Sequence, residues 1–230
     1  MKALVIKYGF VIFIVVTCAQ LIAVQFDFSS LRYITKPLLM PVLALIVYYN
    51  SQHAKRFLIV LALFFSLLGD VFLLLENDSS LFFIFGLVSF LITHILYIIF
   101  FLSKKQLKTS LLKTHPYIPV IIGAYGAGLI YLLYPSLGPL RIPVAVYATV
   151  ICGMLLCSFH IYKSVGPGPG KHFIMGALLL VISDSLLAIN KFYQPIPFAG
   201  LFIMLTYCAA QYFIVRGFIS DEEQVPAFIT

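Results

Sequence analysis

The chain has 230 residues, of which 62% are hydrophobic and only 10% are charged. Soluble domains carry about a quarter charged residues, so this composition excludes a soluble globular domain, a disordered chain and a collagen-like protein. The mean hydropathy of +1.07 instead indicates a chain that lies largely within a membrane.

Apolar stretches long enough to cross a bilayer recur along the whole chain. A membrane-spanning helix needs about 20 apolar residues. Such stretches occur at 5–24, 33–49, 56–75, 81–102, 116–134, 141–162, 172–190 and 197–219. We therefore predict an all-α membrane protein, an eight-helix transmembrane bundle that forms a single integral membrane domain over residues 1–230. The first stretch lacks a small-residue cleavage site, so we expect it to be retained.

The net charge of +7 is best interpreted through the placement of the basic residues. If the N-terminus is cytoplasmic, eleven Lys and Arg residues fall on the cytoplasmic side, and only Arg32, Lys36, Arg141 and Lys191 fall on the other. This is the positive-inside pattern, so both termini are predicted to be cytoplasmic. We expect the lipid bilayer, and no nucleic acid, as a partner. The absence of a retention signal or extended tail is compatible with a bacterial inner membrane, and the oligomeric state is left open.

The cysteines and histidines predict neither a disulfide framework nor a metal site. All four cysteines lie within predicted helices, and the spacing of Cys152 and Cys157 is not a zinc pattern. The five histidines are scattered and show no ligand spacing. We expect no metal and no cofactor.

Two aspartates stand out, because an ionisable group in a membrane helix costs several kcal/mol, about 2.5 or more. Asp70 lies in LALFFSLLGDVFLLL and Asp184 in GALLLVISDSLLAIN. Each is six residues before a polar residue at the non-cytoplasmic end of its helix, which predicts a shared depth of about 9 Å from that end. Intramembrane acids are functional by default, so this pair is the first candidate for a site.

Other polar residues line single faces of the predicted helices. His94 and Tyr97 share a face of the helix at 81–102, and Tyr207 and Gln211 share a face of the helix at 197–219. Lys36 is predicted at the entrance of the second helix. Each of these has an ordinary explanation too, because Tyr, His and Gln often join membrane helices and a lysine at a helix entrance often snorkels to the surface.

A weak internal similarity suggests a 4+4 parallel repeat. The helix with Asp70 is followed by one that begins Gly86-Leu87, and the helix with Asp184 is followed by one that begins Gly200-Leu201. Partners four helices apart run in the same direction, as in a parallel repeat. Chance resemblance between apolar helices is the competing explanation.

Short motifs in a fixed order resemble the lysoplasmalogenase family, also called the YhhN family, of multi-spanning membrane proteins. They comprise Thr35-Lys36-Pro37-Leu38-Leu39-Met40-Pro41, Gly69-Asp70, Phe85-Gly86 with Phe90, His94 and Tyr97, Gly176-Ala177 with Ser183-Asp184 and Leu187-Ala188, and Thr206-Tyr207 with Ala210-Gln211. Both aspartates fit the family pattern.

The resemblance implies a membrane hydrolase that cleaves the vinyl ether bond of a lysoplasmalogen to a fatty aldehyde and a glycerophospho-base. This reaction needs an acid that protonates carbon and a negative group that stabilises the resulting cation or activates water, and two buried carboxylates can divide these tasks. We therefore expect Asp70 and Asp184 to be catalytic, in an order left open. Lys36, His94, Tyr97, Ser183, Tyr207 and Gln211 are expected to bind or orient the lysophospholipid, with Lys36, joined by Arg141 or Lys191, near its phosphate.

Two alternatives remain at this stage. A proton- or cation-coupled transporter of small solutes could use the same aspartate pair, because paired acids in a parallel repeat also suit a carrier. A membrane hydrolase that acts on a different lipid is the other. Proton-dependent uptake into liposomes without lipid hydrolysis would favour the transporter, and identification of the products would separate the two hydrolases.

Overall fold

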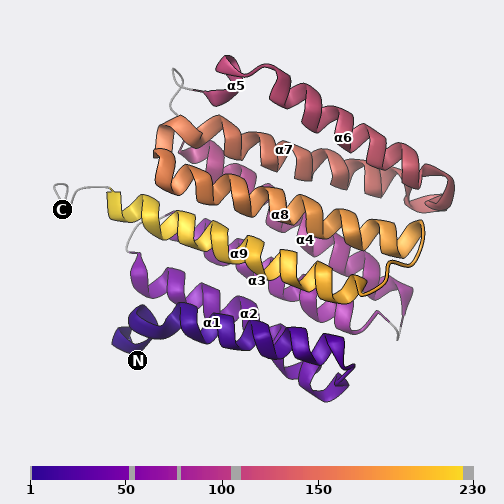
Figure 1. Cartoon of the computed structure of the whole chain (residues 1–230), viewed down its shortest axis with the longest axis horizontal. Helices are drawn as coiled ribbons and strands as arrows, with labels where there is room; N and C mark the ends of the chain where they lie inside the picture. The colour runs from indigo at the N-terminus through magenta and orange to yellow at the C-terminus, as the bar shows by residue number, and fades with distance from the viewer. Residues whose placement is uncertain (1, 52–54, 77–78, 105–109, 225–230) are drawn as a thin grey trace. The chain divides into compact units, whose positions relative to one another are not determined.

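The computed structural model describes residues 2–51, 55–76, 79–104 and 110–224, and all regular structure in these ranges is helical (Figure 1). The long helices are α1 (Lys2–Gln25), α2 (Ser29–Asn50), α3 (Arg56–Leu74), α4 (Ser80–Ser103), α6 (Tyr117–Leu133), α7 (Arg141–Val165), α8 (Pro167–Phe192) and α9 (Ala199–Gln224). A short α5 (Leu111–Thr114) precedes α6, and two 3₁₀ turns, η1 (Tyr134–Ser136) and η2 (Gly138–Leu140), join α6 to α7.

Eight segments of this fold are long and apolar enough to cross a membrane, one for each predicted stretch. The all-α prediction and the predicted set of spanning helices are confirmed for the described residues. The helix contacts divide the chain into two compact units, a first unit of residues 1–100 and 218–230 and a second unit of residues 101–217. The predictions of a single membrane domain and of an internal repeat stay predictions.

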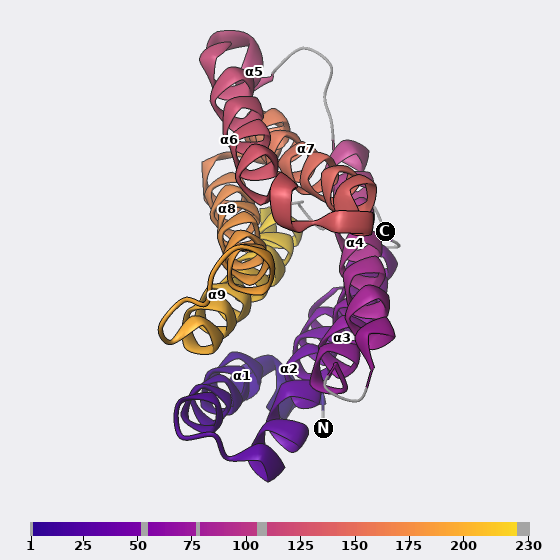
Figure 2. The ribbon, with the colours of Figure 1, turned by 90° about the vertical axis from the view of Figure 1, so that its right-hand side faces the viewer.

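In the first unit, α1 packs against α2 and α2 packs against α3 (Figure 2). Helices α3 and α4 meet closely, because a Cβ atom on Gly69 would lie 2.7 Å from the ring of Phe90. The Ser66 hydroxyl donates a hydrogen bond of 3.2 Å to Thr93 across the same interface. A small residue and a polar pair thus hold two membrane helices together, as is usual where lipid supplies no hydrophobic driving force between helices.

In the second unit, α7 packs against both α6 and α8. Gly176 marks the contact of α8 with α9, since its missing side chain leaves room for the backbone of Ala210 and Ile214. Helices α7 and α8 are joined by the single residue Gly166, whose φ of 83° suits glycine. The predicted stretch began at residue 172, whereas α8 already begins at Pro167, because proline is pre-organised for the first turn of a helix.

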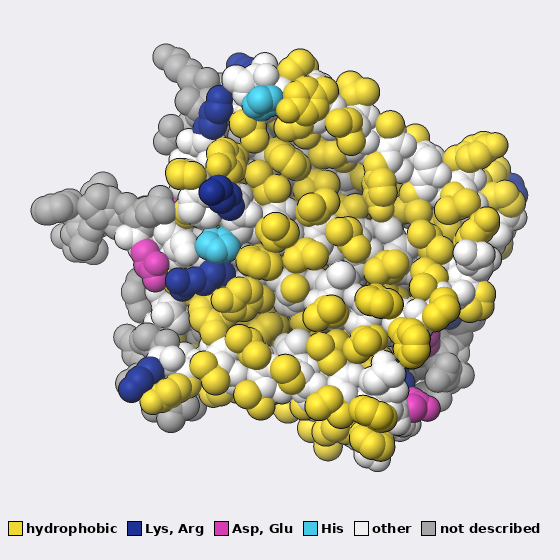
Figure 3. All heavy atoms as spheres, viewed as in Figure 1, with side chains coloured by type: hydrophobic (Ala, Val, Ile, Leu, Met, Phe, Trp, Pro, Cys, Tyr) yellow, Lys and Arg dark blue, Asp and Glu magenta, His cyan; other side chains and the backbone are white. Residues whose placement is uncertain are grey.

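The outward surfaces of the helices have the composition that a bilayer requires. Figure 3 shows hydrophobic side chains over the visible sides of α6 and α8, with Lys, Arg and His side chains near the helix ends. Exposed tyrosines also mark helix ends, with Tyr117 and Tyr134 at opposite ends of α6 and Tyr193 after α8. Tyrosine prefers the level of the lipid head groups, so these positions are consistent with spanning helices.

We predict that Gly176→Ala lowers the free energy of unfolding in detergent by about 1–3 kcal/mol, because the added methyl overpacks the interface. Its Cβ would lie 2.9 Å from the carbonyl oxygen of Ala210 and 3.0 Å from the amide of Ile214, so backbone must move. Gly128→Ala in α6 is the control, since no atom lies within 4 Å of its added Cβ. Equal stabilities of the two variants would contradict the packing described for α8 and α9.

Candidate active site

The first unit holds an ion pair at Asp70. The Asp70 carboxylate on α3 has its Oδ1 atom 3.9 Å from Nζ of Lys36 on α2, and the two side chains are only 2% and 11% exposed. In a low-dielectric environment such a carboxylate needs a nearby positive charge. Lys36 supplies that charge, so the structure brings together two of the residues that the sequence singled out.

Lys36 reaches Asp70 because α2 begins earlier than expected. The helix starts at Ser29, after a turn in which Asp27 has a φ of 52°. Lys36 therefore lies seven residues into α2, about 10 Å along the axis, rather than at its entrance. The interpretation of Lys36 as a snorkelling anchor is wrong, because its side chain is directed at a buried carboxylate.

The sequence around Lys36 also changes the backbone of α2. Pro37 and Pro41 lie inside the helix and lack the amide hydrogen that would bond the carbonyl four residues earlier. Next to Lys36, the Thr35 hydroxyl lies 2.5 Å from Oε1 of Gln20 on α1 and 2.7 Å from the carbonyl of Leu31. The contact with Gln20 ties the lysine-bearing turn to α1.

His94 and Tyr97 lie on α4 in the same unit, and both are fully buried. Two neighbouring contacts fix this part of α4 against α3. The Phe90 ring of α4 packs on Gly69 of α3, and the Ser66 hydroxyl of α3 donates a hydrogen bond to Thr93 of α4. His94 is adjacent in sequence to Thr93, so its backbone is held by the same interface. Their predicted roles in binding or orienting a substrate stay predictions.

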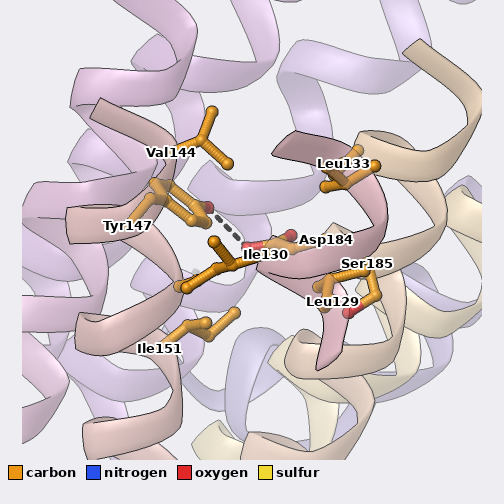
Figure 4. A pocket seen from close by; sticks show the side chains of 10 residues that line it. Leu129, Ile130, Leu133, Val144, Tyr147, Ile151, Asp184 and Ser185 are labelled. Atoms are coloured by element: carbon orange, nitrogen blue, oxygen red, sulfur yellow. Dashed lines mark hydrogen bonds between the residues drawn. The ribbon is translucent and has the colours of Figure 1, made fainter. Parts of the chain in front are cut away.

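The second unit holds the other aspartate in a different environment. The Tyr147 hydroxyl on α7 donates a hydrogen bond of 2.5 Å to Oδ2 of Asp184 on α8 (Figure 4). Tyr147 is buried, and aliphatic side chains such as Val144 and Ile151 surround the pair. A phenol is a neutral donor, so Asp184 is held by a hydrogen bond where Asp70 is held by an ammonium group.

A small cavity adjoins Asp184. It has a volume of ≈ 30 Å³ and lies between α6, α7 and α8, with the Tyr147, Asp184 and Ser185 side chains as its polar groups. This volume is enough for about one water molecule, and the three polar groups could bind it. The arrangement can therefore hold a water molecule beside a half-buried carboxyl group.

Ser183 and Ser185, on either side of Asp184, fix the turn of α8 that carries it. The Tyr125 hydroxyl on α6 donates a hydrogen bond of 2.7 Å to the Ser185 hydroxyl. The Ser185 hydroxyl in turn donates a hydrogen bond of 2.6 Å to the carbonyl of Val181. The Ser183 hydroxyl donates a hydrogen bond of 3.1 Å to the carbonyl of Ile203 on α9. Asp184 is thus positioned from α6, α7 and α9 at once, and the predicted Ser183 has a helix-joining contact.

Tyr207 and Gln211 lie on α9, and both are buried. Ile203, Ala210 and Ile214 face α8, and helical spacing puts Tyr207 on the same side of α9. The predicted residues therefore fall into two groups. Lys36, Asp70, His94 and Tyr97 belong to the first unit, and Ser183, Asp184, Tyr207 and Gln211 to the second. The expected pairing of the two aspartates at a shared depth stays a prediction.

Sequence reasoning missed Tyr147 and Tyr125. Both lie in apolar stretches, IPVAVYATV and VIIGAYGAG, where a lone tyrosine looks like an ordinary helix-packing residue. A carboxyl group within a membrane helix needs hydrogen-bond partners, and these must come from other helices. That requirement was the signal that could have drawn attention to tyrosines on neighbouring helices. Among the described residues, no group of three or more His, Cys, Asp or Glu side chains could hold a metal ion.

Comparison with known proteins places the chain among multi-spanning membrane proteins. The model of the YhhN family matches residues 31–218. The chain is 32% identical over 179 residues to lysoplasmalogenase TMEM86A of Bos taurus, covering 75% of this chain and 70% of that protein. It is 34% identical over 129 residues to human lysoplasmalogenase TMEM86B, covering 56% and 50%. It is also 24% identical over 187 residues to a membrane protein called YhhN of Escherichia coli O157:H7, covering 81% and 86%. No solved structure matches.

We predict that Lys36→Met alone lowers the free energy of unfolding by about 3–5 kcal/mol, because it leaves the Asp70 carboxylate buried without its partner. The double variant Lys36→Met with Asp70→Asn should recover most of that loss, since both charges are then absent. Denaturation of the purified variants in detergent measures both effects.

The control for this prediction is Arg32→Gln, at the exposed pair of Arg32 and Asp27 with side-chain exposures of 39% and 85%. Its effect should stay within about 0–1 kcal/mol. A double variant no more stable than Lys36→Met would show that the two charges do not compensate each other.

Proposed function

Since the chain belongs to the YhhN family, we propose that it is a membrane hydrolase that cleaves the vinyl ether bond of lysoplasmalogens. The relatives named lysoplasmalogenase support the reaction. Within this chain, the proposal is carried by Asp184, a half-buried carboxyl group with a phenol donor and a water-sized cavity beside it. The products would be a fatty aldehyde and a glycerophospho-base.

The reaction begins with proton transfer to carbon. A general acid adds its proton to the vinyl carbon farther from the ether oxygen, and the positive charge that develops is shared by the other vinyl carbon and the oxygen. Water then attacks that second carbon and loses a proton to a base, which gives a hemiacetal. Cleavage of its bond to the glycerol oxygen releases the aldehyde and returns a proton to the alcohol. One water molecule is consumed, and no oxidant or metal takes part.

We assign proton delivery to Asp184. The Tyr147 hydroxyl fixes one carboxyl oxygen of Asp184, and apolar side chains such as Val144 and Ile151 line the space beside it, where a hydrocarbon substrate could come close. Because Oδ2 accepts the Tyr147 hydrogen bond, the proton to be delivered would be on Oδ1. The cavity would hold the attacking water next to the same group, and Tyr147 and Ser185 would orient that water.

We assign the negative charge to Asp70. Lys36 supports an ionised carboxylate there, and a fixed negative group stabilises a cationic intermediate most effectively in a low-dielectric site. In this assignment both carboxylates serve one reaction, much as two carboxylates with different environments divide the work in glycosidases. His94, Tyr97, Ser183, Tyr207 and Gln211 would act as positioning residues on α4, α8 and α9.

The membrane placement is part of the proposal. The excess of basic residues in the segments of one side favours cytoplasmic termini, and a bacterial inner membrane would suit such a protein. The two aspartates would then lie in the half of the membrane away from the cytoplasm. A single-chain lipid substrate could reach them from within the bilayer.

We predict that Asp70→Asn and Asp184→Asn each lower kcat on a lysoplasmalogen by at least about 10²-fold, since each removes a proton-transfer or charge-stabilising group. Purified protein in detergent, with aldehyde release as the readout, measures this. Asp27→Asn is the matched control, because Asp27 is exposed and its left-handed backbone also suits asparagine. Near wild-type turnover by either of the first two variants would refute the pairing.

We also predict a bell-shaped dependence of kcat/KM on pH for the wild-type protein, because one carboxyl group must be protonated and the other ionised.

Tyr147→Phe should lower kcat by about 10-fold and alter one side of the pH profile, since the hydrogen bond to Asp184 is lost. Tyr125→Phe should lower kcat less and leave the profile in place, because Tyr125 acts through Ser185.

A transporter with the same aspartates would give a different result. In liposomes it would carry protons or small cations in a manner that depends on Asp70 and Asp184, and it would leave lysoplasmalogen intact. That outcome, with correctly folded protein, would replace the hydrolase proposal.

A further inference from the structure

We propose that a groove between α6 and α7 binds the hydrocarbon chain of the single-chain lipid substrate and directs its ether group to Asp184. This inference rests on the proposed function and identifies how that site would take its substrate. The groove, called here the α6–α7 groove, is lined by Gly123, Gly126, Ala127 and Ile130 of α6 and by Ala148 and Gly153 of α7, among others.

The groove exists because small residues face each other on the two helices. At Gly126 the helices are close, since an added Cβ would lie 3.0 Å from Sγ of Cys152. At Gly123 the space is open, and no atom lies within 4 Å of an added Cβ. The resulting hollow has a volume of ≈ 430 Å³, which is within the usual size of a small-molecule site.

The lining suits a hydrocarbon rather than a head group. Thr149 is the one hydroxyl residue among the described lining side chains. Its hydroxyl donates a hydrogen bond of 2.8 Å to the carbonyl of Ala145 in its own helix. Cys152 is a free thiol that behaves as a small hydrophobe. A ligand in the groove is therefore offered apolar contacts.

The groove adjoins the cavity at Asp184. Ile130 and Ala148 line both spaces, and Figure 4 shows Ile130 next to Tyr147 and Asp184. A chain in the groove would thus end beside the proposed acid. Its position next to the Asp184 cavity distinguishes the groove from any lipid-facing hollow that bilayer chains would simply fill.

A second hollow adjoins the groove on the side of the C-terminal end of α6. It has a volume of ≈ 600 Å³, shares Ala127 and Ile130 with the groove, and is also lined by Tyr131 and Tyr134. Arg141 is close to this end, because its guanidinium lies 4.4 Å from the centre of the Tyr134 ring. Its Nε also donates a hydrogen bond of 3.3 Å to the Tyr134 carbonyl. A cation at this point suits the phosphate of a lysolipid.

The spacing along the helices fits one orientation of the ligand. From Arg141 to Tyr147 on α7 is six residues, about 9 Å of helix rise. From Ile130 to Ile122 on α6 is eight residues, about 12 Å. A lysolipid has its ether group between the phosphate and the chain. Its phosphate would therefore lie at Arg141, its ether group at Asp184 and its chain along Gly126 and Gly123.

The first test uses lysolipids with a saturated ether bond, which cannot be hydrolysed by this reaction, in a series of chain lengths. Gly123→Leu should weaken binding of long chains by about tenfold, the loss of about two buried CH₂ groups, and leave short chains almost unaffected. Gly128→Leu is the matched control, since Gly128 is also open, lies on α6 and does not line the groove. Arg141→Gln should weaken binding of all chain lengths equally.

The second test uses the absence of tryptophan from the chain. Leu156→Trp, at the far end of the groove, provides a single fluorophore, as do Tyr131→Trp in the second hollow and Phe202→Trp on α9 outside both. A saturated ether lysolipid with bromine at the end of its chain should quench the fluorescence of Leu156→Trp saturably and much more than that of the other two.

Equal quenching of the three variants, or equal effects of Gly123→Leu and Gly128→Leu at all chain lengths, would overturn the groove assignment. Because these measurements use a ligand that is not turned over, they stand apart from the reaction itself. Chain-dependent binding without any cleavage of lysoplasmalogen would reject the proposed function and keep the groove. Cleavage of lysoplasmalogen with no effect of the groove variants would keep the proposed function and reject the groove.

Discussion

A hydrocarbon environment provides no hydrogen bonds, so a carboxyl group between membrane helices must be satisfied by the protein itself. The rest of the structure depends on how this is done at two positions. In the first unit, Lys36 on α2 provides a charge for Asp70 on α3. In the second unit, Tyr147 on α7 provides a neutral hydrogen bond for Asp184 on α8. The same residue type is therefore held in two chemically different ways.

This difference is what makes a division of catalytic work reasonable. A carboxylate with a cationic neighbour suits the stabilisation of positive charge, and a carboxyl group among a phenol and apolar side chains suits proton delivery. Close helix contacts keep both arrangements in place. Gly69, the residue before Asp70, allows Phe90 of α4 to pack closely on α3. The hydroxyl groups of Ser183 and Tyr125 connect the Asp184 turn to α9 and α6.

The fold and the two aspartates could be predicted because both follow from local sequence. Length and hydropathy predict each spanning helix, and a lone acid in such a helix is conspicuous. The partners are harder, because they come from other helices. Tyr147 lies 37 residues before Asp184, and no spacing rule connects them. Lys36 was predicted at a helix entrance because Ser29, Ser30 and Arg32 make the first residues of α2 too polar for an apolar stretch. The α6–α7 groove depends on how two apolar helices pack, which composition alone does not determine.

The central claim is that a protein carboxyl group protonates a vinyl carbon. Hydrolysis of a lysoplasmalogen by the purified protein in D₂O, followed by immediate reduction of the aldehyde and mass spectrometry, tests this directly. Protonation of the vinyl carbon will leave one deuterium on the carbon next to the former carbonyl carbon and none on the carbons of the glycerol. An aldehyde without that deuterium, or a lipid that remains intact under conditions where the protein is folded, would contradict it.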